Sequence, residues 1–316
     1  MVDEMISIAM ATYNGEKYLR EQLDSILMQT HRNFELIVCD DCSTDSTVRI
    51  LREYEKNDSR IKVFVNEENI GFKKNFEKAI SLCKGEYIAL SDQDDIWLPE
   101  HLQLLIENIG THSMAGGNAY LIDGEGTELR ETLAERIGFD ERRSYKIFYR
   151  IFCNSSVFYG HSSLYKTVEL RKALPIPNGI SYHDAWFSAC CCVSDGGCKF
   201  VSSPISKYRL HGKNASGNHK RKKFLERVTN FLFVKKFDTD RIIYCDEILK
   251  RFPHLSEELK LEILQVRELF TNRISNSHRI KSANFILKHY SDIYTTKSKK
   301  ELLFRIFSVL FNFNKE

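Results

Sequence analysis

Residues 87–97 read Tyr-Ile-Ala-Leu-Ser-Asp-Gln-Asp-Asp-Ile-Trp, an apolar run that ends in a group of acidic residues. The run at 87–90 is typical of a short buried strand, and three carboxylates, Asp92, Asp94 and Asp95, follow within a few positions. Carboxylates this close together repel one another and are costly to remove from water unless a cation lies among them. Because ligands of open α/β sheets bind beyond the carboxyl ends of the strands, we predict an α/β fold with a Mg²⁺ or Mn²⁺ site here.

The same acids also allow a structural interpretation. Pro99 and the apolar spacing of residues 102–109 predict a helix just beyond them, and we expect Asp95 to cap it. On this interpretation Asp92 and Asp94 would be solvated loop acids. We favour a functional role for that pair.

The chain before residue 87 alternates between strand and helix patterns. Apolar runs predict strands at 6–11, 34–39, 61–65 and 87–90. Helical spacing predicts helices at 16–28 and 72–82, and between them a helix that carries Val48, Leu51 and Tyr54 and is capped by Ser43 or Thr44. This order predicts a mostly parallel sheet with helices on both faces.

The rest of the chain divides into an irregular stretch and a helical one. Between 110 and 210 we predict a hairpin near 119–129, a helix starting near Ala185, and strands at 199–201 and 205–208. Beyond 220 the pattern is basic and helical, with predicted helices at 224–233, 239–252, 256–271, 280–289 and 299–311. We therefore expect one domain at 1–215 and a basic helical extension at 216–316. The extension either touches an anionic membrane surface through the apolar residues of 304–313 or packs against protein.

Composition narrows the class of protein. The chain has 316 residues and a formal net charge of only +3, so we expect no nucleic-acid partner. A strand pattern begins within a few residues of Met1, which argues against a signal peptide, and no apolar stretch reaches the ~18 residues of a membrane span. The nine cysteines are scattered apart from the run at 190–192, which is typical of reduced thiols. We expect a cytoplasmic protein, held peripherally at the inner face of the membrane if the extension binds lipid.

Two common nucleotide-binding motifs are missing. The first predicted strand runs into Ala-Thr-Tyr-Asn-Gly at 11–15, which has one glycine where a dinucleotide fold needs Gly-x-Gly-x-x-Gly. No phosphate-binding Gly-x-x-x-x-Gly-Lys-Ser/Thr loop occurs either. Asp40 and Asp41, at the end of the second predicted strand, can instead accept hydrogen bonds from a base or a ribose.

Four segments in this order resemble one known family. They are Ala-Thr-Tyr-Asn at 11–14, Asp-Asp-Cys-Ser-Thr-Asp at 40–45, Asn-Ile-Gly-Phe at 69–72 and Ser-Asp-Gln-Asp-Asp-Ile-Trp at 91–97. Together they resemble the family 2 inverting glycosyltransferases of GT-A fold, over about residues 4–212. The last segment is similar to the bacterial branch often labelled rhamnosyltransferase-like.

The resemblance implies roles in binding a nucleotide-sugar donor. Thr12, Tyr13 and Asp41 would line the pocket for base and ribose, and Asp40 would support that loop. Asp92 would face the ribose or the metal, and Asp94 would ligate the metal. The family also contacts the nucleotide in the stretch that holds Lys73, Lys74 and Asn75, although ordinary surface-helix residues are an equal alternative there.

Further roles follow for three positions downstream. Asp184 is the predicted general base, although the preceding residue is His183 where the family usually has an acid, and a plain helix cap is the alternative. The segment Tyr-Arg-Leu-His-Gly-Lys-Asn at 208–214 resembles a motif of the branch. From it, Arg209 or His211 would reach the diphosphate and His211 would complete the metal shell, which suits Mn²⁺ better than Mg²⁺. A purely structural role is an equal alternative for both residues.

The resemblance thus implies a metal-dependent inverting glycosyltransferase. It would move a sugar from a UDP- or dTDP-sugar donor to a glycan or lipid-linked acceptor, in bacterial surface polysaccharide synthesis. Two alternatives are a nucleotidyltransferase that makes a nucleotide sugar and a non-catalytic member that binds glycan or acts as a scaffold. A nucleotidyltransferase would have a glycine-rich basic loop after the first strand, which this sequence lacks. A non-catalytic member would have no need of the paired carboxylates that this sequence contains.

Overall fold

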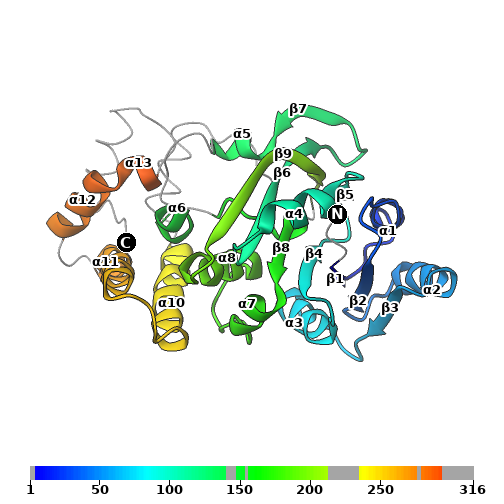
Figure 1. Cartoon of the computed structure of the whole chain (residues 1–316), viewed down its shortest axis with the longest axis horizontal. Coiled ribbons are helices and arrows are strands. Elements are labelled where there is room, and N and C mark those ends of the chain that lie inside the picture. The colour runs from blue at the N-terminus through cyan, green and yellow to red at the C-terminus, as the bar shows by residue number, and fades with distance from the viewer. Residues whose placement is uncertain (1–3, 140–146, 154–155, 213–234, 276–278, 294–316) are drawn as a thin grey trace. The chain divides into compact units, whose positions relative to one another are not determined.

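The computed structural model describes residues 4–139, 147–153, 156–212, 235–275 and 279–293 (Figure 1). The chain forms two compact units, which are described separately. The first comprises Met1–Glu135, Phe158–Ile176 and Tyr182–Ala215, and the second comprises Arg136–Val157, Pro177–Ser181 and Ser216–Glu316. The predicted contiguous boundary at residue 215 therefore misses two short segments that belong to the second unit.

The first unit contains a nine-stranded sheet. Its strands are β1 (Ile6–Thr12), β2 (Phe34–Asp40), β3 (Ile61–Val65), β4 (Tyr87–Ser91), β5 (Ile96–Trp97), β6 (Met114–Ile122), β7 (Glu128–Thr132), β8 (Ser163–Lys166) and β9 (Cys198–Arg209). The order is β3-β2-β1-β4-β8-β6-β9-β5, with β7 paired to β6. β3, β2, β1 and β4 are mutually parallel, and β8 is antiparallel to both β4 and β6. The predicted α/β fold, with a parallel sheet at its N-terminal side, is confirmed.

The helices of this unit are α1 (Leu19–Leu27), α2 (Thr47–Asn57), α3 (Phe72–Leu82), α4 (His101–Ile109), α5 (Leu133–Ile137, whose last two residues count with the second unit), α7 (Thr167–Lys172), α8 (His183–Val193) and the short 3₁₀ helix η1 (Gly160–Ser162). β3 and α3 have the predicted bounds. The second helix starts later than predicted, because Ser43 donates its hydroxyl to Asp40 at 2.6 Å and Ser46 precedes the helix instead. The two strands predicted near 199–208 form one strand, β9.

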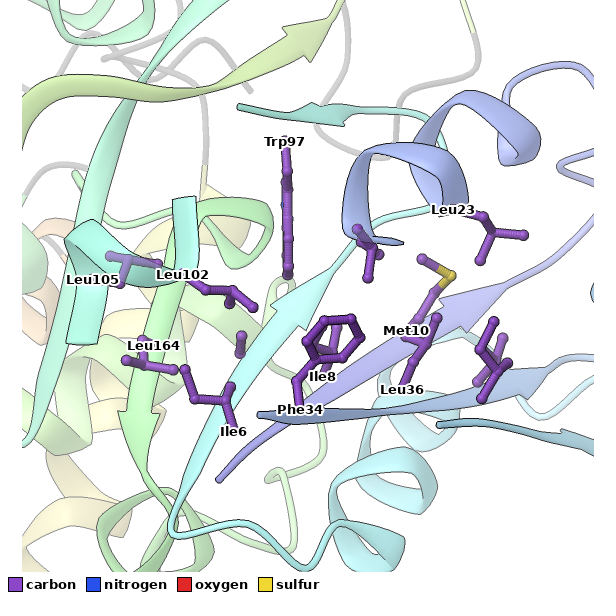
Figure 2. Packing of buried hydrophobic residues seen from close by; sticks show 14 of the residues in the cluster. Ile6, Ile8, Met10, Leu23, Phe34, Leu36, Trp97, Leu102, Leu105 and Leu164 are labelled. Carbon is purple, nitrogen blue, oxygen red and sulfur yellow. The ribbon is translucent and has the colours of Figure 1, made fainter. Parts of the chain in front are cut away.

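One face of the sheet carries the main hydrophobic core (Figure 2). Alternate residues of β1, namely Ile6, Ile8 and Met10, meet Leu23 of α1 and Leu102 of α4 there. Side chains of α2 complete this layer, whereas α3 packs on β1 and β2 without joining the cluster. Each buried aliphatic side chain contributes about 1.5–3 kcal/mol to stability, so this core holds the strands and the helices above them together.

The second unit is helical in the part that the structure describes. Its helices are α6 (Ile147–Cys153), α10 (Lys235–Arg251), α11 (Glu257–Ser275), α12 (Arg279–Lys288) and α13 (Tyr290–Ile293). The Tyr149 ring lies 4.1 Å from the His289 ring, and Arg150 donates to the Ile293 carbonyl, which ties α6 to the C-terminal helices. The predicted helices at 224–233 and 299–311, and the apolar residues of 304–313, lie outside the described residues. Within those residues, no helix is long and apolar enough to cross a membrane.

Candidate active site

The candidate site lies where β1, β2 and β4 end side by side. Thr12 is in register with Asp40 of β2, and Met10 is in register with Ser91 of β4. Because these strands are parallel, the loops that follow them leave the same edge of the sheet. The predicted nucleoside residues and the acidic loop therefore lie next to each other.

Three carboxylates of the site interact electrostatically. Burial, and after it the negative charges of Asp94 and Asp184, raise the pKa of Asp92 to about 8. Asp184 stands in the first turn of α8, 92 residues further along the chain, so the fold brings it to the acidic loop. Such a concentration of negative charge favours binding of a cation.

His211 adds a nitrogen to this group. Its Nε2 lies within hydrogen-bond distance, 2.7 Å, of Oδ2 of Asp94, so the two side chains are in direct contact. Within the described ranges, however, no three His, Cys, Asp or Glu side chains are arranged to hold a metal ion by themselves. A hard divalent ion that takes one or two carboxylates and fills its shell from substrate phosphates and water fits this donor set.

Asp95 has a different role from the predicted helix cap. Helix α4 begins at His101 after Glu100, whereas Asp95 is fully buried and accepts a hydrogen bond from the Arg209 backbone at 2.9 Å. Its second oxygen lies 3.6 Å from Nδ1 of His161 and accepts no hydrogen bond from the residues that the structure describes. Burial holds the pKa of Asp95 well above its ordinary value, and it lowers the pKa of His161 to about 4. The prediction of a cap was wrong because the partner of Asp95 is the end of β9.

Arg209 is committed to contacts within the protein. Its side chain is 1% exposed. Its Nη2 lies 2.6 Å from Glu21, and its Nε donates to the Asp94 carbonyl at 2.8 Å. The guanidinium also lies 4.5 Å from the centre of the Tyr18 ring, which in turn contacts the His211 ring at 5.1 Å. These contacts hold the acidic loop against α1, and a direct contact of Arg209 with the diphosphate stays a prediction.

Arg209→Lys is expected to lower the free energy of unfolding by about 1.5–3 kcal/mol, measured by urea denaturation. Lysine keeps the charge but has no planar fork to reach both Glu21 and the Asp94 carbonyl. Lys207→Ala is the matched control, because the ion pair of Lys207 with Glu128 is partly exposed and worth at most about 1 kcal/mol. Weaker diphosphate binding by Arg209→Lys at unchanged stability would instead support a direct contact between Arg209 and the diphosphate.

The predicted nucleoside residues differ in what they present. Tyr13 is 47% exposed. Thr12 is buried and donates to Asp40 at 2.7 Å. Asp41 is buried and accepts hydrogen bonds from the side chain of Asn66 and the backbone of residues 70 and 71. Tyr13 thus has the side chain that is open to a ligand, and Thr12 and Asp41 shape the loops around it.

Asn75, a predicted nucleotide contact, is buried in the structure. Its amide nitrogen donates to the Cys39 carbonyl at 2.7 Å, and its amide oxygen accepts from Asn66 at 3.0 Å. Both ends of the buried side chain are therefore used inside the protein. Asn66 was not identified from the sequence. Its place directly after β3, at the edge of the sheet where the parallel strands end, is the signal that could have identified it.

Asp184 and His183 have contrasting surroundings. The Asp184 carboxylate accepts hydrogen bonds from the backbone N–H groups of Gly160 at 3.1 Å and Ala185 at 2.7 Å. The His183 ring stacks on Phe76 at 4.2 Å, and its buried nitrogens have no hydrogen-bond partner among the described residues. Burial lowers the pKa of His183 below its ordinary value, so its ring is a neutral packing group.

Comparisons with known proteins agree with this geometry. Residues 7–170, about half of the chain, match the sequence model described as "Glycosyl transferase family 2". An uncharacterized glycosyltransferase of Methanocaldococcus jannaschii is 32% identical over 223 residues, which cover 68% of this chain and 75% of that protein. The Escherichia coli enzyme named UDP-Glc:alpha-D-GlcNAc-diphosphoundecaprenol beta-1,3-glucosyltransferase WfgD is 40% identical over 106 residues, 34% of this chain and 41% of that protein.

Solved structures are similar over nearly the whole chain. Residues 1–349 of Staphylococcus aureus TarS, in complex with UDP-GlcNAc, give a TM-score of 0.59 at 20% identity and cover 98% of this chain and 89% of that one. The mannosyltransferase PcManGT of Pyrobaculum calidifontis, in complex with GDP-Man and Mn²⁺, gives 0.52 at 16% identity, with coverages of 98% and 88%. These likenesses confirm the predicted GT-A fold. Together with the sequence match, which includes β1, the acidic loop and their neighbours, they show that the chain belongs to glycosyl transferase family 2.

Proposed function

We propose that the protein transfers a sugar from a nucleoside-diphosphate donor to a hydroxyl acceptor with inversion at the anomeric carbon. The observation that carries the proposal is the grouping of Asp92, Asp94 and Asp184, in which burial and then the charges of Asp94 and Asp184 raise the pKa of Asp92. A donor diphosphate with its cation would relieve this repulsion. The acceptor would then bind beside Asp184, at the start of α8.

The donor would lie across the ends of β1, β2 and β4. Tyr13, with its exposed ring, would contact the base, and Thr12 and Asp41 would hold the surrounding loops. The similar structures of TarS and PcManGT are complexes with UDP-GlcNAc and GDP-Man, respectively. For this chain we infer a UDP- or dTDP-sugar.

Asp94 would hold the metal, with Asp92 and His211 beside it. Mn²⁺ or Mg²⁺ supplies Lewis-acid stabilisation of the charge that develops on the departing diphosphate. The PcManGT complex contains Mn²⁺, which supports this assignment. Arg209 and Asp95 would keep the acidic loop in place.

Asp184 would act as the general base. Its carboxylate would take the proton from the acceptor hydroxyl as the oxygen attacks the anomeric carbon and the bond to the diphosphate breaks. The backbone N–H groups of Gly160 and Ala185 orient it. The stacking of the His183 ring on Phe76 and the lowered pKa of that ring support Asp184 over His183 in this role.

The acceptor class is inferred from relatives. The full name of WfgD describes a diphosphoundecaprenol-linked acceptor, although this chain aligns with only 41% of that protein. We infer a glycan or lipid-linked acceptor in bacterial surface polysaccharide synthesis. The basic extension would then hold the enzyme at the inner membrane face, which predicts that removal of residues 299–316 weakens cosedimentation with anionic vesicles.

The test of the proposed function is a transfer assay. A panel of UDP- and dTDP-sugars is incubated with GlcNAc-diphosphoundecaprenol, with Mn²⁺ or EDTA, and the released products are identified. We expect Mn²⁺-dependent release of nucleoside diphosphate and a product of inverted anomeric configuration by NMR. Release of inorganic diphosphate from a nucleoside triphosphate and a sugar 1-phosphate, supplied in a parallel assay, would instead indicate a nucleotidyltransferase, and retained configuration would contradict the single displacement.

A further inference from the structure

Gln93 connects the acidic loop to the loop after β1. It stands between Asp92 and Asp94, and its amide pairs with both polar groups of the Tyr13 backbone. The Tyr13 N–H donates to Oε1 at 2.9 Å, and Nε2 donates to the Tyr13 carbonyl at 3.0 Å. This two-point contact joins residues that are 80 positions apart in the sequence.

The surroundings are adapted to this contact. A β-carbon at Gly15 would collide with the Gln93 amide, so a glycine leaves the space that the amide occupies. On the other side, the Asn14 N–H donates to Ser43 at 2.9 Å, and its side-chain oxygen accepts from the Thr44 backbone at 2.8 Å. The loop at 13–15 is thus attached to the loop after β2 and to the loop after β4.

We propose that Gln93 is a positioning residue that couples nucleoside binding to binding of the metal and diphosphate; the inference rests on the proposed function. Tyr13, with its open ring, is the part of its loop available to a nucleoside, while Asp92 and Asp94 lie on either side of Gln93. The two hydrogen bonds fix the Tyr13 backbone relative to the carboxylates. Whatever orders one loop therefore orders the other, and the effect is reciprocal.

Coupling of the two loops by Gln93 can be distinguished from simple stabilisation of the fold. If Gln93 only stabilised its loop, its loss would lower stability but would leave unchanged the factor by which metal raises nucleotide affinity. If Gln93 couples the two loops, that factor itself falls. The factor is the ratio of the Kd for nucleotide without metal to the Kd with metal.

The experiment compares the full-length wild type with Gln93→Met, which keeps the side-chain length and removes both hydrogen bonds. Gln103→Ala is the matched control, because the Gln103 amide donates to Glu107 within α4. Affinities for UDP, dTDP and GDP are measured by calorimetry with Mn²⁺ and with EDTA. Hydrogen exchange at the Tyr13 amide is followed without ligand.

We expect Gln93→Met to reduce the coupling factor by about fivefold or more, as loss of two hydrogen bonds allows, and to speed exchange at Tyr13. Gln103→Ala should do neither. Faster exchange with an unchanged factor would overturn the coupling, and unchanged exchange would overturn the contact itself. If the wild-type protein binds none of the three nucleotides, the proposed function is overturned. If the wild type binds a nucleotide but Gln93→Met has the same coupling factor, only the role of Gln93 is overturned.

Discussion

Asp184→Asn is expected to lower kcat for sugar transfer by about 10²–10⁴-fold, the usual contribution of a positioned general base. The amide cannot take up a proton, but its shape preserves one of the two backbone hydrogen bonds of the carboxylate. Affinity for nucleoside diphosphate with metal should change little, because the donor side of the site is intact. The pKa of Asp92 should fall, since one of the charges that raise it is removed.

The matched control for this substitution is Asp195→Asn. Asp195 is an exposed acid just beyond the C-terminal end of the same helix, α8, so its loss tests the effect of removing one charge nearby. Steady-state kinetics and nucleotide titrations on both variants separate chemistry from binding. Wild-type transfer by Asp184→Asn would remove Asp184 from the role of base.

Asp94→Asn is expected to lower kcat/KM by about 10²-fold or more and to abolish the metal-dependent part of nucleotide binding. Metal stabilisation of a leaving group is worth several kcal/mol, and each 1.36 kcal/mol is tenfold in rate. The amide oxygen can still meet His211, so the loop should keep its shape. Glu100→Gln, an exposed acid six residues further along, is the control.

The same variant has a predicted pH signature without metal. Folded Asp92, with a pKa of about 8, retains a proton that an unfolded aspartate loses near pH 4. The unfolded state therefore binds fewer protons between these values, and stability falls as pH rises from about 4 to 8. Removing the Asp94 charge lowers the pKa of Asp92 and makes this fall smaller. Thermal denaturation in EDTA across that range, with the same slope in Asp94→Asn and wild type, would contradict the interaction.

Local patterns predicted the parts of the fold that local interactions determine. The bounds of β3 and α3 follow from apolar periodicity, with Gly71 at a φ of +83° just before the helix. The start of α2 was predicted too early because Ser43, a suitable cap by type, is used by Asp40. The segment 136–157 could not be assigned to the second unit, because the helices that its aromatic residues pack against lie more than a hundred residues away.

The candidate site shows the same division. The resemblance to the family predicted roles for Asp92, Asp94, Asp184 and His211. The fold brings the three carboxylates close enough to interact and places His211 against Asp94. The tasks of Asp95 and Arg209 depend on contacts with each other and with Glu21, across distances in sequence that no spacing rule reveals. The contact of Gln93 could not be predicted for another reason. An uncharged residue between two aspartates gives no indication in the sequence of which residue it contacts.

The most direct test of the account is the thermal stability of the wild-type protein with UDP, dTDP and GDP, each in Mn²⁺, Mg²⁺ and EDTA. A ligand that binds only the folded state raises Tm by mass action. We expect one nucleotide to raise Tm with a divalent cation, and the increase to vanish in EDTA and in Asp94→Asn. No increase with any nucleotide under any condition would contradict a nucleoside-diphosphate site at the ends of β1, β2 and β4.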